Sequence, residues 1–291
     1  MNEATHDANF QPSKTKQQVN RWILTELSKA TDEVTDNIEK YRFNDAAAAS
    51  YRFVWNTFCD WYLELLKPVF NGEDAVAKAE AQATVAHVLD EIYKLLHPFM
   101  PFMTEELWTK TAESRDTLLC HADWPVADVR DDAAADEINW LIELVSEVRS
   151  VRSEMNIKPG QMMQLEIVGA NDVTQSRLTD NEAAIMRLAR IDCISMASVA
   201  PEGSAQMVVG EATVCLPLKG VVDFGAEKAR LEKELAGINK DIKLVSGKLG
   251  NEKFVANAPE AIVQENKDRL AELEAKKVIV GEALERVRAF G

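Results

Sequence analysis

The chain has 291 residues, 46% of them hydrophobic, which is enough for about two domains with cores of their own. It contains no run of roughly 18 apolar residues, and its polar N-terminal stretch lacks the apolar segment of a secretory signal. These features argue against a membrane protein and predict a cytoplasmic one. The net charge of −15 at first argues against a nucleic-acid partner as well.

The charge is, however, unevenly distributed along the chain. Residues 226–291 hold 13 basic and 12 acidic residues, a net charge of +1, whereas residues 1–225 hold 20 and 36, a net charge of −16. The acidity of the longer part therefore does not exclude RNA binding through a local surface. No two of the cysteines form a CxxC pair, so the sequence predicts neither a metal site nor a redox dithiol.

After a polar segment at residues 1–18, residues 19–157 are predicted to form an antiparallel helix bundle. Its strongest signal lies at residues 45–66, where large apolar residues recur at steps of three and four: Tyr51, Val54, Trp55, Phe58, Trp61, Tyr62 and Leu65. Such a seam marks the buried face of one helix. The rings of Trp55, Phe58 and Trp61 are therefore assigned to the core rather than to base stacking.

Helix ends in this region follow from capping residues and prolines. Asp45, which precedes four alanines, is expected to begin the aromatic helix. A further helix should end near Leu96, because Pro98 and Pro101 follow it. Thr104 is expected to cap a short helix that runs to Trp108. The last helix of the bundle is predicted from Asp136 to about Met155.

Residues 158–225 are predicted to form a small α+β subdomain that follows the bundle. Residues 163–167 alternate like a half-buried strand after the turn at residues 158–160. A helix is expected at residues 181–190. Further short strands are expected at residues 193–196, 206–209 and 213–218.

Residues 226–291 are predicted to form an antiparallel coiled-coil hairpin with arms of roughly 35–45 Å. Apolar residues recur at alternating steps of four and three in each arm, from Leu231 to Leu249 and from Val263 to Val287. Asn266 and Lys277 interrupt the second seam and are expected to help fix its register. The fold class is thus mainly α: a helix bundle, a small α+β subdomain and a helical hairpin.

Motifs of catalysis are missing from the sequence. It contains no GxxxxGK[ST], GxGxxG, HExxH or GxSxG pattern, and its four histidines are scattered. Composition and periodicity alone leave two classes of function open. One is an RNA-binding protein, and the other is a coiled-coil adaptor that binds protein, since a heptad seam can pair between chains as well as within one.

Four stretches resemble the class I valyl-tRNA synthetases of bacteria. Residues 55–68, WNTFCDWYLELLKP, look like a helix of the anticodon-binding bundle, and residues 95–108 resemble a run shared with the leucyl and isoleucyl enzymes. Residues 148–160, VRSVRSEMNIKPG, and the tail with FVANAPE at residues 254–260 also match. The order of the four stretches supports the resemblance. The terminal hairpin, together with the lack of a cysteine zinc site, favours the valyl branch over the corresponding part of an isoleucyl or leucyl synthetase.

The resemblance implies the tRNA-binding part of a valine-tRNA ligase, with the valine tRNA as partner. The whole enzyme would use ATP and magnesium, whereas this chain is expected to hold no cofactor and no metal. The HxGH and KMSKS signatures and the editing domain are absent, so the chain is expected to be a fragment without catalytic activity. It is also expected to be a monomer. In the full-length protein it would adjoin the missing catalytic and editing domains.

The resemblance also implies two sets of contact residues. In the bundle, Leu63 would offer an apolar surface to the anticodon, Glu64 would accept a hydrogen bond from a base, and Lys67 would meet a phosphate. Secondary anticodon candidates are Arg42, Asn44 and Arg52. On the hairpin, the candidates for the outer corner of the tRNA are Arg269, Lys248, Lys253, Lys243 and Lys240.

Overall fold

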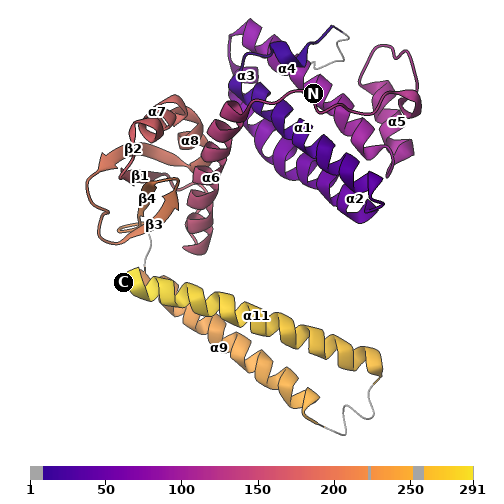
Figure 1. The fold of residues 1–291 in the computed structure, drawn as a ribbon. Helices are drawn as coiled ribbons and strands as arrows, with labels where there is room; N and C mark the ends of the chain where they lie inside the picture. The colour runs from indigo at the N-terminus through magenta and orange to yellow at the C-terminus, as the bar shows by residue number, and fades with distance from the viewer. Residues whose placement is uncertain (1–8, 222–223, 252–258, 291) are drawn as a thin grey trace. The chain divides into compact units, whose positions relative to one another are not determined.

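The structure of the chain, a computed structural model, describes residues 9–221, 224–251 and 259–290. It divides into two compact units, residues 1–142 and 143–291, and each is described by itself (Figure 1). Helices dominate the described residues, and the second unit holds a four-stranded sheet. The predicted mainly α class with a small α+β part is confirmed. Among the described helices, none combines the length and the apolar composition that crossing a bilayer requires.

The first unit is a helix bundle. Its elements in chain order are η1 (Pro12–Lys14), α1 (Gln18–Glu39), α2 (Phe43–Arg52), the π-helix η2 (Phe53–Tyr62), α3 (Leu63–Asn71), α4 (Ala75–Leu96), α5 (Pro101–Lys110) and η3 (Leu119–His121). The helix α6 (Asp132–Glu154) begins in this unit. Asp74 caps α4, because its carboxylate accepts hydrogen bonds from the backbone N–H groups of Val76 and Ala77, both at 3.0 Å.

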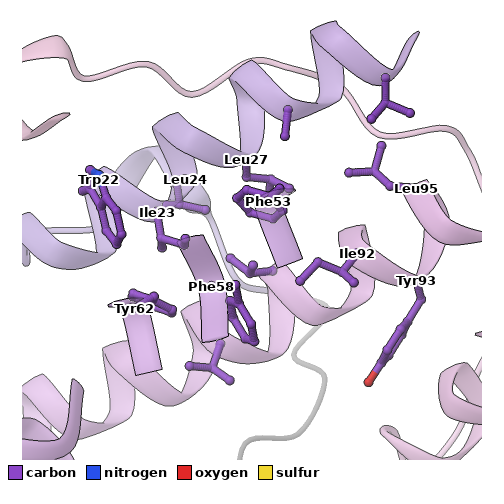
Figure 2. Close-up of a cluster of buried hydrophobic side chains, with 14 of the residues drawn as sticks. Trp22, Ile23, Leu24, Leu27, Phe53, Phe58, Tyr62, Ile92, Tyr93 and Leu95 are labelled. Atoms are coloured by element: carbon purple, nitrogen blue, oxygen red, sulfur yellow. The ribbon is translucent and has the colours of Figure 1, made fainter. Parts of the chain in front are cut away.

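The core of the bundle lies between α1, η2, α3 and α4 (Figure 2). Trp22, Phe58 and Tyr62 are buried there, and the Tyr62 ring lies 6.4 Å from Trp22 and 5.7 Å from Phe58, measured between centroids. The polar atoms of these rings are satisfied. The Tyr62 hydroxyl donates to Asn20 Oδ1 at 2.7 Å, and Trp22 Nε1 donates to Asn139 Oδ1 at 3.0 Å.

Two predicted helix starts are wrong. The aromatic helix begins at Phe43, so Asp45 lies within its first turn instead of capping it. The short helix α5 begins at Pro101, which fits a first turn because the missing N–H would have no partner there. Thr104 is therefore inside the helix, where its hydroxyl donates to the Met100 carbonyl at 2.9 Å and lies 2.8 Å from His97 Nδ1.

A buried ion pair anchors the segment after α5, and no sequence pattern predicted it. The Arg115 guanidinium donates to both carboxylate oxygens of Asp90 on α4, at 2.9 and 2.6 Å, with both side chains less than 10% exposed. Arg115 Cζ lies 3.7 Å from the centroid of the Trp108 ring, and Arg115 Nε donates to the Trp108 carbonyl at 2.9 Å. One side chain thus joins α4, α5 and the following loop.

His87 on α4 should make stability depend on pH. Burial lowers the pKa of this imidazole, which packs against the Phe10 ring at 5.4 Å between centroids. The unfolded chain then binds the proton more tightly, so the contribution of His87 to stability is present above about pH 6.5 and is lost as pH falls through the lower folded pKa. The free energy of unfolding in urea should fall between about pH 7.5 and about pH 5. This fall should be smaller for His87→Gln than for the parent chain. Equal losses in the two proteins would contradict this.

The sheet of the second unit has the strand order β2-β1-β4-β3, formed by β1 (Met163–Val168), β2 (Ile191–Ala197), β3 (Ser204–Val209) and β4 (Ala212–Pro217). β1 pairs parallel with β2 and antiparallel with β4, which pairs antiparallel with β3. The parallel pair needs a crossover, supplied by α7 (Asp172–Asp180) and α8 (Glu182–Ala189). The four predicted strands and the helix at 181–190 are confirmed, whereas α7 was not predicted.

Two arginines in the last turns of α6 give the matched stretch at residues 148–160 a structural role. The buried Arg152 donates through Nη2 to the carbonyls of Gln161 at 2.7 Å and Lys158 at 3.2 Å, and so holds the turn that leads into β1. Arg149 Nε donates to the Leu188 carbonyl at the end of α8, at 3.0 Å. These side chains therefore serve the packing of the second unit.

The hairpin is formed by α9 (Phe224–Leu249) and α11 (Glu260–Phe290), which pack along their apolar seams. Seven predicted seam residues are buried: Leu231, Ile238, Val245, Val263, Val280, Leu284 and Val287. Lys277 is exposed, so its predicted place in the seam is wrong; its ammonium group stays in solvent because burial without a partner would be costly. The Asn266 amide donates to its own helix, at the Ile262 carbonyl, 2.7 Å away.

Candidate nucleic-acid interface

The predicted contact residues of the bundle all lie on one helical rod formed by α2, η2 and α3 and on the turn before it. The middle of this rod is a π-helix, in which each N–H bonds to the carbonyl five residues back. This pattern shifts the buried face: Phe53, Phe58, Tyr62 and Leu66 are buried at steps of five, four and four. The predicted seam is wrong at Tyr51 and Trp55, which are exposed.

The three primary anticodon candidates lie together at the start of α3. Leu63 is half-buried and packs against the bundle core, while Lys67 is exposed one turn further on. The ammonium group of Lys67 pairs with the carboxylate of the half-buried Glu64. A surface pair at this spacing contributes little to stability.

The secondary candidates lie at the other end of the rod, where α1 meets α2. Arg42 Nη2 is 3.1 Å from Asp36 Oδ2, and Arg52 Nη2 is 2.6 Å from Glu33 Oε1. These four side chains, with Asn37 and Asp45, line a surface depression of about 290 Å³. Asn44 is exposed in the first turn of α2. Leu63 lies eleven positions after Arg52, or roughly 16 Å along a helix, so the structure forms two clusters instead of one.

The depression at the second cluster is lined by side chains of both charges. Around the depression, Glu33, Asp36 and Asp45 outnumber the two arginines. A hydrogen bond from Lys40 and the charges of Lys40 and Arg42 lower the pKa of Asp36, against the opposing effect of burial. With Lys40 also paired to Asp36, the depression offers no excess of positive charge to phosphates.

The predicted lysines of the hairpin lie away from the seam. Lys240, Lys243 and Lys248 are exposed on α9, and Arg269 is exposed on α11. Within the described residues, no ion pair involves these four side chains, whereas Lys276 pairs with Glu234 at 3.0 Å and Arg288 with Glu232 at 3.2 Å. Lys253 and the 254–258 part of the matched tail stretch lie outside the described residues.

The heptad register also reveals a cation that the prediction missed. Lys233 and Lys240 each lie two residues after a buried seam position, Leu231 and Ile238, which places both on the face of α9 opposite α11. Both are exposed. The seven-residue spacing to Lys240 could have identified Lys233 in the sequence. Together these lysines form a cationic face along α9, in a region with nearly balanced charge overall.

Two family models match the chain. The model described as the anticodon-binding domain of tRNA ligase matches residues 20–167, which is half of the chain. The chain belongs to this family. A second model, described as the valyl tRNA synthetase tRNA binding arm, matches residues 223–288, which include α9 and most of α11. The predicted resemblance to the valyl synthetases is thereby confirmed.

Curated members of the family extend the match over the whole chain. A valine–tRNA ligase of Rhizobium meliloti (strain 1021) is 60% identical over 294 residues, covering 100% of this chain and 31% of that protein. Ligases of the same name from Mesorhizobium japonicum and Caulobacter vibrioides are 57% and 50% identical and are covered to 32% and 33%. The chain thus spans about a third of the length of these relatives.

Proposed function

We propose that this chain is the tRNA-binding part of a valine–tRNA ligase. One observation carries the proposal: models of two different tRNA-binding elements match the helix bundle and the hairpin separately. The bundle would bind the anticodon loop, and the hairpin would contact the outer corner of the same tRNA. Two linked contacts raise the overall affinity above that of either one, because the second binds at high effective concentration.

In the bundle, the cluster at the start of α3 is proposed to meet the anticodon. The half-buried Leu63 supplies a fixed apolar surface for a splayed base, and the adjacent Glu64 accepts from a base amino group. Lys67 leaves its surface pair with Glu64 to neutralise a phosphate. Arg42, Asn44 and Arg52 form the second proposed set, although the carboxylates beside both arginines weaken their attraction to phosphates.

On the hairpin, the exposed cations are proposed to bind the sugar-phosphate backbone. Lys240, Lys243 and Lys248 offer one such surface on α9, and Arg269 offers another on α11. Lys253 completes the proposed set. Backbone contacts of this kind position the RNA without reading its sequence, and they weaken with salt because bound counterions are released.

Binding of this chain to the valine tRNA and to an anticodon-swapped version, across a salt series, tests the proposal. Affinity that falls with salt and favours the native anticodon would support both contacts. Equal, salt-sensitive affinity for the two tRNAs would support the hairpin contact and contradict anticodon reading by this chain. An absence of binding to either tRNA would overturn the proposal.

The Arg269→Ala variant should bind the valine tRNA more weakly and unfold at an unchanged urea concentration. Loss of one phosphate contact should reduce the slope of log affinity against log salt concentration by about 1, equally for both tRNAs. Lys276→Ala is the matched control on the same helix, because Lys276 already pairs with Glu234. Unchanged affinity in Arg269→Ala would remove this residue from the proposed contact set.

The rival function, a coiled-coil adaptor, required a seam that is free to pair with another chain. In the structure, α9 and α11 bury Leu231, Ile238 and Val245 against each other, so the seam is occupied within one chain. This supports the proposal that the chain is a monomer. Its mass in solution, measured by light scattering at several concentrations, tests that proposal, and a mass that doubles would contradict it.

Valine attachment with ATP and magnesium is proposed for the whole ligase and not for this chain alone. The chain spans about a third of its relatives and contains neither of the two ATP-site signatures of the family. Within the described residues, no group of three or more His, Cys, Asp or Glu side chains could hold a metal ion. We therefore expect tRNA binding without aminoacylation from the chain as it stands.

A further inference from the structure

Four large aromatic side chains are exposed on the turn before α2, on α2 itself and at the start of η2. Tyr41 is 82% exposed, Phe43 53%, Tyr51 61% and Trp55 54%. They form two ring pairs: Tyr41 and Phe43 meet edge to face at 6.3 Å, and Tyr51 and Trp55 stack at 6.4 Å with an angle of 13° between their planes. We call these four residues the aromatic strip. Clusters of exposed apolar side chains on this scale mark interaction surfaces in soluble proteins.

The backbone holds these rings in solvent through two unusual features. The π-helix η2 buries Phe53 and Phe58 and thereby leaves Tyr51 and Trp55 on the outer side of the rod. Tyr41 follows α1 with a φ of 58°, a left-handed conformation that glycine adopts far more readily than a bulky residue. Local strain of this kind persists at sites where the resulting side-chain position is used.

The composition of the strip, together with the charge beside it, favours a protein partner over RNA. Tyrosine and tryptophan make up three of the four strip residues, and both are enriched among the residues that contribute most to protein–protein binding. Glu33, Asp36 and Asp45 line the same depression as Arg42 and Arg52. Because these acidic side chains pair with Lys40 and the two arginines, the surface beside the strip has no excess of positive charge to attract phosphates.

We propose that the aromatic strip is a docking surface for the part of the ligase that lies outside the aligned third. The inference rests on the proposed function. Its occupant follows from the comparison of lengths: relatives that match the whole chain contain about twice as much further polypeptide, which can supply the missing covering surface. Docking there would bury the four rings and fix the bundle against the remainder of the enzyme.

Hydroxyl-radical footprinting with mass spectrometry tests this inference. The chain alone is compared with a full-length chimera in which it replaces the aligned segment of the Rhizobium meliloti ligase. Oxidation of Tyr41, Tyr51 and Trp55 should fall about fivefold in the chimera, as their exposed fractions drop from more than half to roughly a tenth. Leu244 on the hairpin, 56% exposed, is the matched control and should be oxidised equally in both. Equal oxidation of the strip in both proteins would overturn the inference.

Further arms separate the rival occupants. Protection of the strip in the chain alone on addition of valine tRNA would assign it to RNA and overturn docking. Protection that grows with the concentration of the chain alone would assign it to a second copy, with the same consequence. If the chimera does not fold, the polypeptide outside the aligned segment is added in trans. Binding should then be weakened at least tenfold by Trp55→Lys and unaffected by Leu244→Lys, and equal binding of both variants would overturn docking.

The two proposals fail in different ways. Unprotected strip residues in a chimera that still binds the valine tRNA would contradict the docking surface alone. A chimera whose strip is protected but which binds no tRNA would contradict the proposed function and leave the docking surface standing.

Discussion

Replacing Arg115 with alanine is expected to lower the free energy of unfolding by about 3–5 kcal/mol. The substitution leaves the Asp90 carboxylate, whose side chain is 7% exposed, without its bidentate partner. It also removes the stacking on Trp108 and the hydrogen bond to the Trp108 carbonyl. Urea unfolding followed by circular dichroism measures the loss.

Arg52→Ala is the matched control for this prediction. Arg52 pairs with Glu33 at 2.6 Å, but both side chains are about half exposed, so its removal should cost no more than about 1 kcal/mol. The double variant, with Asp90→Ala and Arg115→Ala, leaves no buried charge alone. Its loss in free energy of unfolding should therefore be smaller than the sum of the losses in the two single variants. Equal losses for Arg115→Ala and Arg52→Ala would show that the pair does not anchor the loop.

Replacing Tyr62 with alanine should lower the free energy of unfolding by about 3–5 kcal/mol, as measured by urea unfolding. Its ring is fully buried between Trp22 and Phe58, and its hydroxyl is the hydrogen-bond partner of the buried Asn20 Oδ1. The variant therefore leaves both a cavity and an acceptor without its donor. Tyr62→Phe separates the two effects, because it keeps the ring and should cost only about 1–3 kcal/mol.

The neighbouring Trp61→Ala is the control that tests the phase of the rod. Trp61 is half-buried and packs at the edge of the core, so it should cost less than Tyr62→Ala although tryptophan is larger. A regular α-helix with the predicted seam would place both rings in the core. A larger loss for Trp61→Ala would therefore contradict the buried face that η2 defines.

Much of the fold follows from local rules that the sequence displays directly. Pro98 and Pro101 predicted the break between α4 and α5, and alternation predicted β1. The heptads of α9 and α11 predicted a hairpin because a repeated apolar position can be buried only against a matching one. α7 escaped notice because its surface-exposed residues carry little periodicity, although Asn171 caps it by accepting from Thr174 N–H at 2.9 Å.

For the candidate contact residues too, local patterns identified some features, whereas others depended on the fold. Leu63, Glu64 and Lys67 could be selected from a matched motif, and the structure places them on consecutive turns of one helix. Their proximity to Arg42, Asn44 and Arg52 could not be judged, because distance along a bundle depends on where each helix begins and turns. Lys233 could have been found from the heptad spacing alone.

By itself, the sequence determined the helical class, the strands, the hairpin seam and the family, all of which depend on residue type at short spacing. The tertiary structure alone decided the π-helix phase, the exposure of Tyr51 and Trp55, and the joining of Asp90 to Arg115. The physical reason is shared. A π-helix and a buried ion pair are stable only when surrounding side chains complete their packing, and those neighbours are distant in the chain.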